Sequence, residues 1–98
     1  MSNDIVCFMV RLSIKPEHAD AVAAGIAGAV DPTRREPGNI VFEAARSAVD
    51  PNVIVLYEVW ASNEDYQRHN ERPEMKERMA MYGAVLAGPP EITPLARM

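Results

Sequence analysis

The sequence is poor in the residues that build most metal and nucleotide sites. Its 98 residues include one cysteine, Cys7, and two histidines, His18 and His69. A single cysteine cannot close an internal disulfide, so nothing in the sequence requires an oxidising compartment. The cysteine and histidines have no recognisable metal-ligand spacing. Neither a glycine-rich nucleotide-binding loop nor a GxSxG nucleophile elbow occurs.

Long apolar runs and an excess of basic charge are also missing. The apolar run at residues 5–10 is too short to cross a bilayer or to form the core of a signal peptide, and the start of the chain is polar and acidic. The formal net charge is −4, and the ten Lys and Arg residues are dispersed, which argues against a nucleic-acid groove. We therefore expect a cytoplasmic protein that binds neither nucleic acid nor a membrane.

The composition is that of one small globular domain. Hydrophobic residues make up 48% of the chain and charged residues 24%, which excludes a disordered chain. A chain of this length buries about 65% of its unfolded surface, enough for one core and not for two. We expect residues 1–98 to form a single domain without a separate cofactor-binding unit.

The hydrophobic pattern predicts the order strand, helix, strand, strand, two helices, strand. A helix starting at Pro16 has an apolar stripe and is expected to be interrupted at Asp31-Pro32, with a short turn restarting there through Glu36 as the alternative. Ser62 to Asp65 has the form of a capping box. The predicted strands are 5–14, 40–46, 53–60 and 91–97, the last at a sheet edge, and the later helices are 63–70 and 74–87. This order is the split βαβ pattern of an α+β, ferredoxin-like fold.

The strand at 53–60 is apolar on both faces. Ile54 and Leu56 lie on one face, and Val53, Val55, Tyr57 and Val59 on the other. An antiparallel sheet covered by helices on one side should have a polar outer face. A second copy of the same sheet is the simplest cover for the apolar outer face, so we predict a homodimer with sheet packed on sheet.

Four residues outline an aromatic pocket with titratable groups. His69 follows Tyr66 by three residues, so both project from one helix face. Glu58 and Trp60 share one face of a strand. A carboxylate buried there needs a partner, for which Arg72, Arg78 and His69 are the candidates. The alternative is ordinary packing, with Glu58 in a structural ion pair and His69 on the surface.

Methionines and one tyrosine of the last predicted helix bear on the same pocket. Met75, Met79 and Tyr82 lie on one helical stripe. Methionine fills irregular gaps in cores and also lines adaptable apolar pockets. This stripe is therefore expected to be either core or the wall of a pocket.

The chain resembles the antibiotic biosynthesis monooxygenase superfamily over almost its whole length. The resemblance is carried by Lys15-Pro16-Glu17, by Arg35-Glu36-Pro37-Gly38-Asn39 with Phe42, by Leu56-Tyr57-Glu58-Val59-Trp60, and by His69, Arg72-Pro73 and Gly88-Pro89. Within the superfamily it is most similar to the branch of quinol monooxygenases and of the isomerase that processes the phosphorylated autoinducer-2 signal.

The resemblance implies a dimeric α+β barrel that oxygenates quinol, polyphenol or polyketide-like aromatic substrates with dioxygen and no flavin, haem or metal. It implies His69 as the proton-transfer group, with Trp60 and Tyr66 as pocket aromatics. With these three as catalytic residues, we assign substrate binding to Glu58, Arg72, Met79, Tyr82 and Asn39.

Three departures from the family limit what the resemblance implies. Leu56 lies near the position at which polyketide-tailoring members use an Asn, and Met79 occupies the position at which haem-degrading members need a His. Ala29 and Val30 replace polar residues of the isomerase. Two alternatives to a monooxygenase stay open: an isomerase of a small hydroxy-dione, and a non-catalytic ligand-binding or stress protein.

Overall fold

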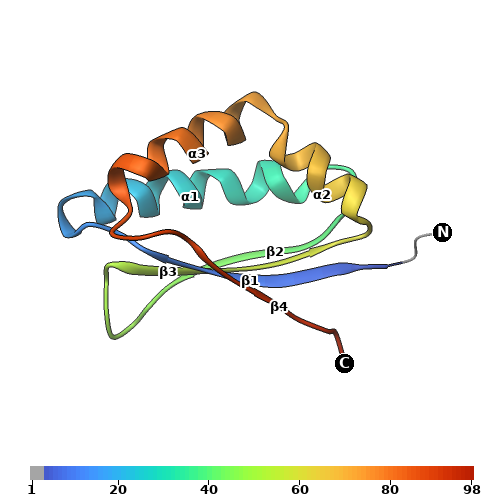
Figure 1. The fold of residues 1–98 in the computed structure, drawn as a ribbon, viewed down its shortest axis with the longest axis horizontal. Helices are drawn as coiled ribbons and strands as arrows, with labels where there is room; N and C mark the ends of the chain where they lie inside the picture. Colours follow the sequence, from blue (N-terminus) through green and yellow to red (C-terminus); the bar gives the residue numbers. More distant parts are fainter. Residues whose placement is uncertain (1–3) are drawn as a thin grey trace.

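The protein consists of one antiparallel sheet with all its α-helices on one face (Figure 1). The computed structural model describes residues 4–98. The strands are β1 (Val6–Ser13), β2 (Asn39–Arg46), β3 (Val53–Trp60) and β4 (Glu91–Pro94). The helices are α1 (Ala19–Arg34), preceded by a 3-10 turn at Pro16–His18, then α2 (Asn63–Asn70) and α3 (Pro73–Val85).

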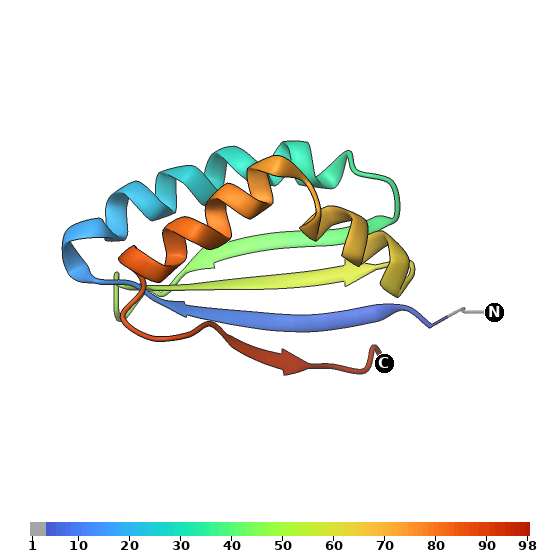
Figure 2. The ribbon, with the colours of Figure 1, turned by 45° about the horizontal axis from the view of Figure 1, so that its top comes forward.

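The strand order is β2-β3-β1-β4, and every neighbouring pair is antiparallel. Figure 2 shows β3 lying between β1 and β2, which are the two strands joined through α1. This split βαβ arrangement is the predicted ferredoxin-like α+β fold. The short β4 forms one edge, as its Pro94 requires.

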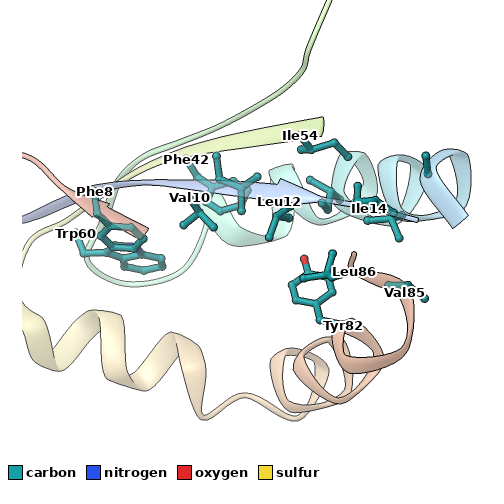
Figure 3. Close-up of a cluster of buried hydrophobic side chains, with 14 residues drawn as sticks. Phe8, Val10, Leu12, Ile14, Phe42, Ile54, Trp60, Tyr82, Val85 and Leu86 are labelled. Atoms are coloured by element: carbon teal, nitrogen blue, oxygen red, sulfur yellow. The ribbon is translucent and has the colours of Figure 1, made fainter. Parts of the chain in front are cut away.

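The core lies between the helices and the inner face of the sheet. The alternate residues Phe8, Val10, Leu12 and Ile14 of the first strand segment are all buried and face the helices, as the period of two predicts. Figure 3 shows Phe8 and Trp60 toward one end of this cluster and Tyr82, Val85 and Leu86 toward the other.

Helix α1 does not break at Asp31-Pro32, and that prediction was wrong. The helix continues through Pro32 to Arg34. Pro32 lies in the last turn, where the missing N–H removes one helical hydrogen bond and little helix follows. Thr33 is buried, and Arg34 Nε donates to the carbonyl oxygen of Phe42 at 3.0 Å. These contacts hold the last turn against β2.

Helix α2 begins at the predicted cap. The Ser62 hydroxyl accepts a hydrogen bond from the backbone N–H of Asp65 at 3.1 Å and donates one to the Asp65 carboxylate at 2.9 Å. Gly38, in the turn before β2, has a φ of 83°, and a Cβ there would overlap the Asp65 side chain. The missing side chain therefore allows the first turn of α2 to lie against this turn.

The outer face of the sheet carries no helix among residues 4–98 (Figure 1). Cross-strand pairing places Met9 beside Tyr57 and Val41 beside Val59 on this face. Met9 is exposed and Val41 and Tyr57 are half-buried. The apolar outer face that the sequence predicted is therefore present. No described helix is long and apolar enough to cross a membrane.

Candidate active site

A cavity of about 90 Å³ lies between the inner face of the sheet and the helices. It reaches the surface beside Met79 of α3 and Ile92 of β4, both of which are exposed. Most of its wall is apolar. The polar side chains that line it are those of Glu58, Tyr66, His69, Asn70, Arg78 and Tyr82.

Glu58 is a carboxyl group inside this apolar wall. The alternation of β3 turns Glu58 and Trp60 to the core, where they are 5% and 0% exposed. The indole N–H of Trp60 donates to Glu58 Oε1 at 3.0 Å. Burial raises the pKa of Glu58 from 4.5 to about 7, against the opposing effect of the Trp60 hydrogen bond and with a smaller contribution from the negative charge of Glu36. Glu58 therefore exchanges a proton near neutral pH.

The prediction that a cationic side chain pairs with Glu58 was wrong. Arg72 and His69 both lie against Glu36 instead, and Arg78 Nη1 lies 2.9 Å from the sulfur of Met75. The hydrogen bond that Glu58 makes is to an uncharged indole. Because no ion pair offsets its burial, the raised pKa follows directly.

His69 and Tyr66 come from successive turns of α2 and belong to one aromatic cluster. The His69 ring centroid lies 4.8 Å from that of Trp60 and 6.5 Å from that of Tyr66. The Tyr66 ring centroid also lies 4.9 Å from that of Phe8. His69 is only 4% exposed, so the alternative of a surface histidine is wrong. The structure brings Glu58, Trp60, Tyr66 and His69 together, as the sequence predicted.

Sequence reasoning missed Glu36, which completes the surroundings of His69. Its Oε1 lies 2.8 Å from His69 Nδ1 and 3.1 Å from Arg72 Nε. Glu36 precedes Pro37-Gly38 in the turn between α1 and β2, which we interpreted only as a turn. A carboxylate in that turn has no local signal for pairing with a histidine on another helix. The spacing of His69 and Arg72 at one helix end was the available hint.

The other predicted substrate-binding residues fall into two groups. Met79 and Tyr82 line the cavity, and burial raises the pKa of Tyr82, which keeps its phenol protonated at neutral pH. Arg72 and Asn39 do not line it: Arg72 lies beside Glu36, and Asn39 Nδ2 donates to the Val41 carbonyl oxygen at 3.2 Å. Trp60, expected as a pocket aromatic, does not line the cavity either, but its indole N–H donates to Glu58, which does.

Three of the four positions that depart from the family pattern, Ala29, Leu56 and Met79, line the cavity and give its wall apolar surface. The fourth, Val30, borders a separate groove beside Ala44. Among residues 4–98, no cluster of three His, Cys, Asp or Glu side chains is arranged to hold a metal ion.

The fold and cavity define a small α+β protein with a buried aromatic site that contains a carboxyl group, Glu58, and an imidazole, His69. Residues 5–81 match the model of the antibiotic biosynthesis monooxygenase family. Because this match spans most of the sequence, the chain belongs to that family. A search of curated proteins finds no match.

Solved structures show the same fold. Rv0793 from Mycobacterium tuberculosis is 27% identical with a TM-score of 0.86, over 97% of this chain and 96% of that one. A candidate antibiotic biosynthesis monooxygenase from Nitrosomonas europaea is 23% identical with a TM-score of 0.87, over 100% and 94% of the two chains. PA3566 from Pseudomonas aeruginosa is 19% identical with a TM-score of 0.89, over 100% and 99%. The latter two similarities concern the fold alone.

Proposed function

We propose that this protein is a cofactor-independent monooxygenase of an electron-rich hydroxylated ring of the quinol, polyphenol or polyketide type. The observation that carries this proposal is the pairing of two proton acceptors, Glu58 and His69, in one aromatic and otherwise largely apolar cavity. Membership of the antibiotic biosynthesis monooxygenase family supports the reaction type.

The cavity supplies what such a reaction requires of a protein. The aromatic and aliphatic wall binds a ring and excludes water, and His69 accepts the proton of a ring hydroxyl. The resulting anion is electron-rich enough to reduce dioxygen without help. For a quinol, the ring carbon takes one oxygen atom, and the other leaves as water after the base returns a proton to the peroxide. One quinol and one dioxygen then give one hydroxyquinone and one water.

Glu58 and Tyr82 complete this assignment. The Glu58 oxygen that is not bonded to Trp60 has no partner among residues 4–98, so it is available to a second substrate hydroxyl. The Tyr82 phenol lies at the α3 wall of the same cavity and is a hydrogen-bond donor to a ring oxygen. Met79 forms the apolar rim through which the ring enters.

Oxygen uptake with menadiol, the reduced form of menadione, tests the proposal. Uptake by the wild type should exceed autoxidation, and His69→Ala should abolish the excess. His18→Ala is the matched control because His18 is the other histidine and does not line the cavity. Uptake equal to autoxidation, or a fully active His69→Ala variant, refutes the proposal.

The same pair of proton acceptors also favours a second candidate, the isomerisation of a small hydroxy-dione. Such a reaction moves a proton between two carbons or oxygens and consumes no oxygen. Turnover of a hydroxy-dione under nitrogen would identify it. A rise in melting temperature with ligand but no turnover of either substrate class would instead indicate a binding protein.

We also propose that the protein is a homodimer through the outer face of its sheet. Met9, Val41, Val55 and Tyr57 give this face an apolar surface that the helices do not cover. Light scattering after size exclusion should give twice the chain mass, and Val55→Lys should give a monomer. Val49→Lys is the control, because Val49 is exposed in the loop before β3. A wild-type monomer at micromolar concentration contradicts the proposal.

A further inference from the structure

Glu36 and His69 form a buried pair beside the cavity. Glu36 lies in the turn after α1 and His69 near the end of α2, 33 residues apart in sequence, and Glu36 Oε1 is 2.8 Å from His69 Nδ1. Their side chains are 9% and 4% exposed. The pair is therefore shielded from the water that weakens surface ion pairs.

His69 contacts Glu36 and also lines the cavity. It borders both the cavity and a groove between α1 and α3, whereas Glu36 borders only the groove. The hydrogen bond of His69 uses Nδ1, and Nε2 has no hydrogen-bond partner within residues 4–98. Among these residues, Arg72 Nε is the only fully buried side-chain nitrogen or oxygen without a hydrogen bond. His69 Nε2 is therefore not fully buried and keeps some accessible surface.

The chemistry of the two groups fixes the donor. An ionised carboxylate only accepts hydrogen bonds, so Nδ1 carries the proton and donates to Glu36. The Arg72 guanidinium, with Nε 3.1 Å from the same oxygen, supplies the countercharge. In a neutral imidazole with Nδ1 protonated, Nε2 holds the free electron pair.

We propose that Glu36 is a positioning residue that holds His69 in the Nδ1–H tautomer, so that Nε2 accepts the substrate proton. This inference rests on the proposed role of His69 as the base. Glu36 does not touch the substrate and does not take the proton itself. It orients the ring and stabilises the imidazolium that forms when Nε2 is protonated.

Nitrogen NMR of the histidines tests the tautomer without turnover. A two-bond ¹⁵N–¹H spectrum at about pH 8.5, where an ordinary imidazole is neutral, should show His69 with a protonated Nδ1. Glu36→Gln should lose this preference. Glu74→Gln, which removes a carboxylate 4.0 Å from the same Arg72, should keep it. A wild-type His69 protonated at Nε2 overturns the inference whether or not any variant folds.

Kinetics separate positioning from a purely structural role. With menadiol, Glu36→Gln should lower kcat by about 10- to 100-fold and leave KM unchanged, whereas Glu74→Gln should match the wild type. Glu36→Gln with wild-type kcat and an unchanged tautomer would show that Glu36 only ties the helices together, and would overturn the inference. If menadiol is not oxidised at all, the proposed function fails, but the NMR result still decides the role of Glu36.

Discussion

Replacing Glu58 by glutamine tests the central feature of the site, the uncompensated buried carboxyl group. Burial raises the pKa of Glu58 from 4.5 to about 7. At about 1.4 kcal/mol per pKa unit, that difference corresponds to about 3 kcal/mol of folding free energy. Glu58→Gln keeps the shape and an acceptor for the Trp60 N–H but cannot ionise.

The sign of the effect follows from which state loses its proton first. Below about pH 4.5, Glu58 is protonated in both the folded and the unfolded chain, and its contribution to stability is fully present. Between about pH 4.5 and 7 the unfolded chain ionises while the folded protein does not, so wild-type stability falls. Above about pH 7 the loss is complete. Glu58→Gln has no such loss.

Urea unfolding at matched protein concentration measures this difference. The free energy of unfolding of Glu58→Gln minus that of the wild type should increase by about 3 kcal/mol from pH 4.5 to pH 8. Glu43→Gln, at an exposed ion pair with Arg34, should show almost no such increase. A constant difference between Glu58→Gln and wild type across this range would refute the assignment of Glu58 as a buried, uncompensated acid.

Three further substitutions test the packing around the site. Trp60→Phe removes the indole donor, so the pKa of Glu58 should rise further, as ¹³C NMR titration of the carboxyl group would show. Leu12→Ala at a 1% exposed core position should lower the free energy of unfolding by about 2–5 kcal/mol in urea. Gly38→Ala should lower the melting temperature, because it combines a positive φ with overlap onto Asp65, at a cost of about 1–3 kcal/mol.

Each of these has a contrary outcome. An unchanged or lower pKa in Trp60→Phe would mean that the indole does not stabilise the Glu58 carboxylate. A loss below about 1 kcal/mol in Leu12→Ala would place Leu12 outside the packed core. A Gly38→Ala variant as stable as the wild type would mean that α2 does not approach the turn before β2 closely.

Local patterns in the sequence predicted most of the fold. The strand at Val53–Trp60 has the predicted bounds, and Ser62 caps α2 as expected. Both depend on neighbouring residues alone, through alternation and capping. The break expected at Pro32 was wrong because contacts with β2, which local sequence does not reveal, hold the end of α1.

The site was predictable only where one element carried several of its residues. Glu58 with Trp60 and Tyr66 with His69 are close in sequence, so strand and helix periodicity place each pair on one face. Glu36 was missed because its partner lies 33 residues away. The prediction of a cationic partner for Glu58 was wrong for the same reason. His69 and Arg72 contact whichever carboxylate the folded chain places beside them, and that carboxylate is Glu36.

Glu58 cannot be explained as a stabilising element of the fold. A structural carboxylate would have a cation beside it, but the nearby Arg72 and His69 lie against Glu36. An apolar residue on β3 would avoid the cost of about 3 kcal/mol at neutral pH, a large share of the stability of a domain of this size. A group that weakens the fold and exchanges its proton near pH 7, inside a cavity beside a histidine, has the properties of a proton-transfer residue.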